Sequence, residues 1–141
     1  MKKFLPVVIT LGAILIILLV LTYWETPDKD ILDGSIWRVE NIQSFPLVEY
    51  STLTIRFHNH KVSGSSECNR FKGRYELTGN DISIEILERT DEACMEPEII
   101  QQDGVFIDYL GKSKSYTFSG QDLKFYTATG EELLDFLLIA E

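Results

Sequence analysis

Two cysteines and two nearby histidines are the side chains of this sequence best suited to covalent or metal chemistry. Cys68 and Cys94 are its only cysteines, and an even pair in an oxidising compartment most simply forms a disulfide. His58 and His60 would complete a Cys₂His₂ metal set, and two free thiols are a third alternative. The spacing of this set is not that of a zinc finger, and no C-x-x-C pair exists. We therefore expect a disulfide and no metal.

Catalytic motifs are absent from the sequence. It contains no G-x-S-x-G, no H-E-x-x-H and no Walker loop. His58 and His60 flank Asn59 in an expected hairpin turn, where solvated residues are far commoner than general bases. We expect no catalytic residue and no cofactor, and we predict that the protein is not an enzyme.

The charge of the chain is strongly acidic and unevenly distributed. The formal net charge is -9, yet Lys2 and Lys3 precede every acidic residue and are separated from all of them by an apolar segment. The remainder of the chain carries a charge of about -11, which repels phosphate backbones and anionic lipid head groups. We expect no nucleic-acid partner.

Residues 4–24 form an uncharged apolar segment with the sequence FLPVVITLGAILIILLVLTYW. At ~1.5 Å per helical residue this segment spans roughly 30 Å, the thickness of a bilayer's hydrocarbon core. The alternative is a cleaved signal peptide, whose apolar region is usually ~7–15 residues long and ends in small residues. This segment is longer and ends in Tyr23 and Trp24. We predict that residues 1–24 are an uncleaved membrane anchor.

The charges beside this segment predict its orientation. Lys2 and Lys3 lie on one side, and acidic residues begin at Glu25 on the other. Positive residues are retained on the cytoplasmic side, so the N-terminus is expected in the cytoplasm and the following domain in the periplasm or outside the cell. The sequence therefore predicts a single-pass protein of the cell (inner) membrane.

Residues 25–33, with the sequence ETPDKDILD, are expected to form a linker because they are short, polar and contain Pro27. Asp28, Asp30 and Asp33 before Gly34 faintly resemble a calcium loop. The spacing is off by one, however, and no glutamate closes a loop of about twelve residues, so we expect no ion here.

Alternation of apolar and polar residues with period two predicts strands that each bury one face. Turns containing Gly or Asn separate several of them and favour hairpins, hence an antiparallel sheet. The clearest strands are predicted at 52–58, 71–77 and 81–86, and shorter ones at 36–42, 61–65, 115–119, 122–127 and 132–139.

A helix is predicted over residues 95–110. Pro97 suits a first helical turn, and Ile99, Phe106 and Leu110 repeat at helical spacing. About eight strands with one helix are enough to close, or nearly close, a barrel filled by alternate side chains. Six aromatic residues on the strands are expected mostly to face its interior as core: Trp37, Phe57, Phe71, Tyr75, Phe118 and Phe125.

Several motifs resemble the META domain family, also described as the HslJ-like heat-shock protein domain. They are TLTIRF, VSGSSECNRFKGRYEL, RTDEAC and a helix ending in FIDYL, preceded by Gly34 and Trp37. The core of the resemblance consists of Gly64, Cys68, Asn69, Arg70, Gly73, Tyr75, Thr90, Ala93 and Cys94. The chain departs from the family at Glu67, where glycine is usual, and at Glu92, where an apolar residue is usual.

The resemblance covers residues 34–141 and implies a mainly β fold. The family's fold is a lipocalin-like or cracked antiparallel β-barrel with a packed helix, and its two cysteines are thought to bond. Its members are typically secreted, lipid-anchored or envelope proteins linked to heat shock, antibiotic resistance or motility, with no firmly assigned activity.

Asn69 and Arg70 are the most tempting polar residues for a surface site. The simpler interpretation is that Asn69 satisfies backbone groups at a bend and that Arg70 pairs with a carboxylate. We expect an outward-facing interaction or stress-tolerance module that contacts another envelope protein. The alternative is a carrier for a small apolar or lipid ligand inside the barrel, which needs a pocket of at least ~300 Å³.

Overall fold

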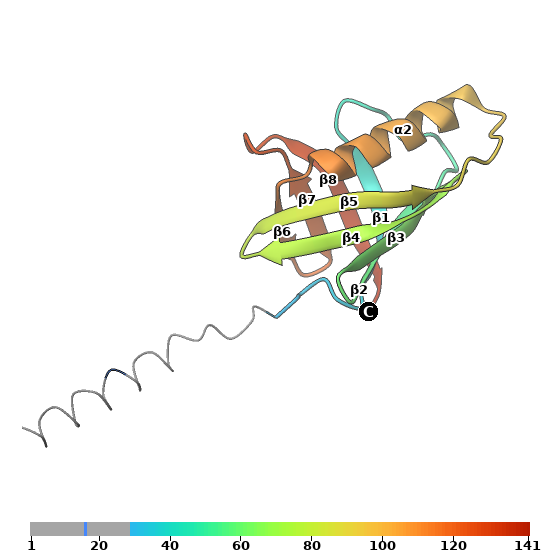
Figure 1. Cartoon of the computed structure of the whole chain (residues 1–141). Helices are drawn as coiled ribbons and strands as arrows, with labels where there is room; N and C mark the ends of the chain where they lie inside the picture. Colours follow the sequence, from blue (N-terminus) through green and yellow to red (C-terminus); the bar gives the residue numbers. More distant parts are fainter. Residues whose placement is uncertain (1–15, 17–28) are drawn as a thin grey trace, which may run out of the picture.

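The computed structural model describes Ile16 and residues 29–141 of the chain (Figure 1). The predicted spanning helix over residues 4–24 lies, apart from Ile16, outside the described residues. Among the residues that are described, no helix has the length and apolar character needed to cross a membrane.

Within residues 29–141, eight antiparallel strands and one helix make up the fold, as the sequence pattern predicted. Each strand pairs with the next along the chain, and β8 pairs back with β1, so the sheet closes on itself. The elements are β1 (Ile36–Ile42), β2 (Leu53–His58), β3 (Lys61–Ser66), β4 (Arg70–Thr78), β5 (Asp81–Arg89), α2 (Pro97–Lys112), β6 (Ser115–Ser119), β7 (Asp122–Tyr126) and β8 (Glu132–Ala140).

The helix α2 begins at Pro97, two residues later than predicted, and lies alongside β5 (Figure 1). Proline is suited to this first turn because its missing N–H would have no intrahelical partner. Phe106 and Leu110 on its apolar face are fully buried. The helix connects β5 to β6, which align at a single residue pair, Asp81 with Ser115. The β5–β6 contact is therefore the narrowest pairing of the closed sheet.

Aromatic rings fill the interior of the sheet. Phe57 packs edge-on against Tyr75 with ring centroids 4.9 Å apart, and Phe125 packs in the same way against Phe136. Phe71 of β4 contacts Phe106 of α2, with centroids 5.7 Å apart. All of these side chains are at most 2% exposed.

The expected core position of Phe118 is wrong. Phe118 is 40% exposed and lies near the end of the short β6, where its ring packs edge-to-face with that of Trp37. Trp37 itself is buried as predicted.

The last residues of the predicted linker are part of the folded domain. Leu32 is fully buried, and the backbone N–H of Gly34 donates to the carbonyl of Phe57 at 2.9 Å. Asp30 accepts hydrogen bonds through Oδ1 from the backbone N–H groups of Leu32 and Asp33, a compact local turn. Residues 30–33 therefore pack with the domain that the sequence places from Gly34 onward.

Candidate functional site

The disulfide joins two connections at one end of the sheet. Cys68 lies between β3 and β4, and Cys94 lies between β5 and α2, with Cα atoms 5.9 Å apart. The pairing confirms the predicted bond. Cys94 precedes α2, whereas Cys68 lies between two strands of the sheet. The bond therefore fixes the start of the helix against the sheet.

Asn69, next to Cys68, organises the same two connections through its side chain. It is 6% exposed, and its Oδ1 accepts hydrogen bonds from the Thr90 hydroxyl and from the Glu92 backbone N–H, each at 2.9 Å. The Thr90 hydroxyl in turn accepts from the backbone N–H of Arg70. The prediction that Asn69 satisfies backbone groups at a bend is thus confirmed.

Asp103 of α2 is the centre of this buried polar cluster and was missed in the sequence. Its side chain is 1% exposed and accepts hydrogen bonds from Asn69, from the Ser66 hydroxyl and from the Arg89 guanidinium. The signal was present: Asp103 lies four residues after Ile99 and three before Phe106, on the apolar face of the helix. A carboxylate on such a face needs buried partners.

Gln102, the next residue along the helix, forms a second polar contact with the sheet. It is fully buried, its Oε1 accepts from the Val48 backbone N–H at 2.7 Å, and its Nε2 donates to the Ser51 hydroxyl at 2.9 Å. The loop between β1 and β2 is thereby fixed to α2.

Arg70 does not make the predicted ion pair. Within residues 29–141 its side chain is exposed and pairs with no carboxylate, whereas the partly exposed Arg89 pairs with the buried Asp103. The difference arises because Arg70 alternates with the inward-facing Phe71 on β4, so it points outward.

The two motif glycines act through close packing. A side chain on Gly64 would meet the carbonyl of Thr54 and the ring of Phe71, and one on Gly73 would meet the carbonyl of Glu85. Neither position has room for a Cβ, which explains glycine at both.

Tyr75 lies at the other end of β4 from the disulfide. Its hydroxyl donates to Asp30 Oδ2 at 2.6 Å, and its ring is 1% exposed. Burial, with smaller contributions from the hydrogen bond and charge of Asp30, raises the pKa of Tyr75 well above its usual range. Tyr75 therefore binds the segment before β1, through Asp30, and does not contribute to the cluster around Asn69.

The histidines lie at the β2–β3 hairpin, at the same end as Tyr75: His58 ends β2, and His60 is in the turn. Asn59 and His60 adopt φ values of 50° and 59°, the left-handed pair of a tight hairpin turn. His58 Nδ1 lies 3.5 Å from Asp33 Oδ1. Among the described residues, no three Asp, Glu, His or Cys side chains gather closely enough to hold a metal.

A hollow of about 460 Å³ lies beside the disulfide. It is lined by the segments 48–51, 67–68 and 93–96, and by Ile99. We call it the disulfide hollow. Ala93, a motif residue, is in the wall of this hollow. Asn69 and Asp103 are buried and do not line the hollow, but Asn69 accepts a hydrogen bond from the backbone N–H of Glu92, next to Ala93.

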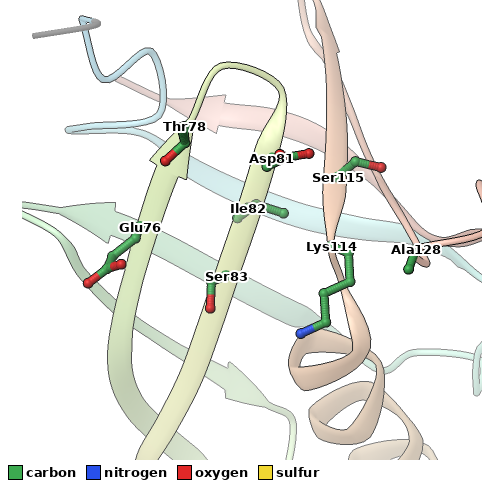
Figure 2. Close-up of a pocket in the computed structure, with 8 residues that line it drawn as sticks. All are labelled: Glu76, Thr78, Asp81, Ile82, Ser83, Lys114, Ser115 and Ala128. Atoms are coloured by element: carbon green, nitrogen blue, oxygen red, sulfur yellow. The ribbon is translucent and has the colours of Figure 1, made fainter.

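A second hollow, of about 580 Å³, lies where β5 and β6 diverge. Figure 2 shows Lys114 reaching from the segment between α2 and β6 toward β5, where Ser83 lies, with Glu76 on the neighbouring β4. The hollow reflects the narrow β5–β6 contact.

Solved structures with the same fold are similar to this chain at low sequence identity. The NMR structure of a protein from Burkholderia xenovorans has a TM-score of 0.62 and 22% identity, over 78% of this chain and 85% of that one. A second NMR structure has a TM-score of 0.61 and 23% identity, over 76% and 91%. A DUF4847 family protein from Bacteroides vulgatus ATCC 8482 has a TM-score of 0.53 and 15% identity, over 63% and 60%. No curated protein matches the chain significantly.

The family assignment comes from the sequence model of the META domain, which matches residues 30–138. The match begins at Asp30, the residue that binds Tyr75, and ends within β8. It includes the disulfide, the buried cluster around Asp103, the strands β1 to β7 and most of β8. The chain therefore belongs to the META domain family.

Proposed function

We propose that this chain is a non-catalytic, membrane-anchored envelope protein whose META domain faces away from the cytoplasm as an interaction or stress-tolerance module. Residues 4–24 supply the anchor, and the positive residues before them keep the N-terminus in the cytoplasm. The narrow β5–β6 contact fits the cracked, lipocalin-like barrel that the resemblance implies.

One observation carries the proposal: the chain enters the domain at one end, and the disulfide hollow lies at the other. Tyr75 holds Asp30 by a 2.6 Å hydrogen bond beside the buried Leu32, so the entry point is fixed. Ser51 precedes β2 and lines the hollow, whereas Asn59 follows β2 and donates to Asp33. An anchored domain would thus present the hollow away from the bilayer.

The packed interior argues against a carrier. A ligand inside the sheet needs a pocket of at least ~300 Å³. Instead, the rings of Phe57, Phe71, Phe125 and Phe136 occupy the centre with at most 2% exposure. The hollows described above open on the outside.

Photo-crosslinking in living cells tests the proposal. A benzoylphenylalanine at Tyr50, in the wall of the hollow, is expected to form a discrete adduct with another envelope protein. The control places the same group at Phe118, which is also exposed but lies near the end of β6. No adduct at Tyr50, or identical adducts at both positions, would contradict an interaction role for this end.

A further inference from the structure

The disulfide hollow combines an apolar wall with acidic groups. Val48, Ala93 and Ile99 contribute apolar side chains, together with the disulfide itself. Its volume of about 460 Å³ is within the range of ~300–1,000 Å³ that is typical of binding pockets. It can accept a few side chains of a peptide segment.

All charged residues that line the hollow are glutamates. They are Glu49, Glu67 and Glu96, and among the described residues no Lys, Arg or His joins them in the wall. Glu67 Oε2 accepts a hydrogen bond from the Thr52 backbone N–H at 2.7 Å, which holds this carboxylate at the edge. The wall therefore presents negative charge without a compensating cation and favours a cationic partner.

Two large side chains at this hollow are almost completely exposed. Tyr50 is 92% exposed and Met95 is 89% exposed, more than the other large apolar residues of the described chain. Tyrosine is enriched at binding hot spots, and methionine adapts its shape to a partner. Both would bury apolar surface if a segment occupied the hollow.

The position of the hollow narrows the choice of occupant. It lies at the far end of β2 from the chain entry, a distance of roughly 20 Å for six residues at ~3.3 Å each. Anionic lipid is disfavoured by the glutamates, and a second copy would bring the same negative charge. A cationic segment of a different protein fits both the charge and the place.

We infer that the disulfide hollow binds a peptide segment of a partner protein in which Lys or Arg residues stand beside apolar residues. This inference rests on the proposed interaction role and names the chemistry of the partner. The apolar side chains would pack on Tyr50, Met95 and the disulfide, and the cations would face the three glutamates.

The test measures binding of two short fluorescent peptides to the full chain in nanodiscs of neutral phosphatidylcholine. One peptide alternates Lys with Leu, and the other alternates Glu with Leu. Fluorescence anisotropy is expected to show binding of the Lys peptide, weaker at higher salt, and no binding of the Glu peptide. Equal binding of both peptides would overturn the inference.

Two variants with the same change in charge test whether the peptide binds at the disulfide hollow. The triple variant E49Q/E67Q/E96Q is expected to lower affinity for the Lys peptide by about tenfold or more. The control E76Q/D81N/D122N removes the same charge from exposed positions outside the hollow and is expected to change affinity by less than about twofold. Equal losses in the two triples would mean general attraction to an acidic protein and would overturn the inference.

A third variant tests the apolar contribution. Y50S/M95S is expected to lower the affinity for the Lys peptide by about tenfold. The salt dependence of binding should stay unchanged, because the variant removes apolar contact and no charge. Unchanged affinity would overturn the inference.

Failure of this inference differs from failure of the proposed function. If Tyr50 crosslinks a partner in cells and E49Q/E67Q/E96Q leaves that adduct undiminished, the interaction role stands and the cationic chemistry is wrong. If the adduct is a second copy of this chain, the inference is likewise overturned. If no adduct forms although the Lys peptide binds the hollow, the cationic preference is supported and the proposed cellular role fails.

Discussion

The carboxylate of Asp103 accepts a hydrogen bond from the side-chain amide of Asn69, with Oδ2 and Nδ2 2.9 Å apart. This contact joins α2 to the β3–β4 connection beside the disulfide. Arg89, from the end of β5, supplies the opposite charge. The arrangement explains why a carboxylate is tolerated on the buried face of a helix: its negative charge is both paired and hydrogen-bonded.

Replacing this carboxylate should destabilise the domain strongly. Asp103→Ala is expected to lower the free energy of unfolding by about 3 kcal/mol, because Asn69 and Arg89 lose their buried partner. Urea unfolding of the full chain in mild detergent, followed by near-ultraviolet circular dichroism, measures the change. Asp108→Ala on the same helix is the control, since its ion pair with Lys112 is exposed to solvent and contributes little to stability. A similar small loss for both would contradict the buried role of Asp103.

Two glycine substitutions should have opposite signs. Gly73→Ala is expected to destabilise the domain by about 1–3 kcal/mol, because its Cβ would collide with the Glu85 carbonyl. Gly104→Ala is expected to stabilise it by up to about 1 kcal/mol, because this exposed helical position has free space and alanine favours a helix. Thermal unfolding of the two variants compares them directly. A stabilising Gly73→Ala would show that β4 and β5 do not approach as closely as described.

Tyr75 should make stability depend on alkaline pH. Its pKa is raised in the folded state, chiefly by burial, so its contribution is complete below the unfolded pKa of ~10 and is lost as pH rises above that value. Above pH ~10 the free energy of unfolding should fall by up to about 1.4 kcal/mol per pH unit on account of this group. Tyr75→Phe is expected to be less stable near neutral pH and to show a shallower alkaline slope. Parallel slopes for the two proteins would contradict a buried, protonated hydroxyl.

Glu67 should tolerate glycine better than alanine. Its φ of 73° is in the left-handed region, which disfavours side chains, and its carboxylate compensates by accepting from the Thr52 N–H. Glu67→Ala keeps the strain and loses the hydrogen bond, at a cost of about 0.5–1.5 kcal/mol. Glu67→Gly loses the hydrogen bond and relieves the strain, so its stability should stay near that of the natural chain. The order is checked by urea midpoints, and an alanine variant as stable as the glycine variant would refute it.

This position also explains one departure from the family. Glu67 has a left-handed backbone, the conformation that glycine adopts most readily, and its side chain accepts a hydrogen bond from the Thr52 N–H. The departure at Glu67 is visible in the sequence, but the hydrogen bond that accommodates this residue is visible only in the structure.

The strands were predictable because one face of each is buried and the other is exposed to solvent. The period-two pattern predicted the limits of β1 and β6 as they are found, and those of the other shorter strands within one residue. The helix was shifted by two residues at each end, because Pro97 takes the first helical position and Gly111 and Lys112 continue the last turn.

The buried polar contacts were less predictable. A carboxylate at Asp103 was visible on the helical face, but its partners Ser66 and Arg89 lie 37 and 14 residues away, and pattern carries no information on such pairings. The burial of Leu32 was not predictable for a related reason: the segment 25–33 is mostly polar, and the space in which Leu32 is buried exists only in the folded domain. Local spacing predicts faces, whereas tertiary contacts decide which polar residues are paired.

Accessibility of the disulfide from outside the cell tests the central claim most directly. Spheroplasts carrying the full chain are treated with an impermeant phosphine reductant and then with a maleimide polymer that cannot cross the bilayer. Cys68 and Cys94 border the open hollow, so both should be modified in intact spheroplasts, and neither without reductant. Modification that appears only after the membrane is permeabilised would place the domain in the cytoplasm and contradict the account.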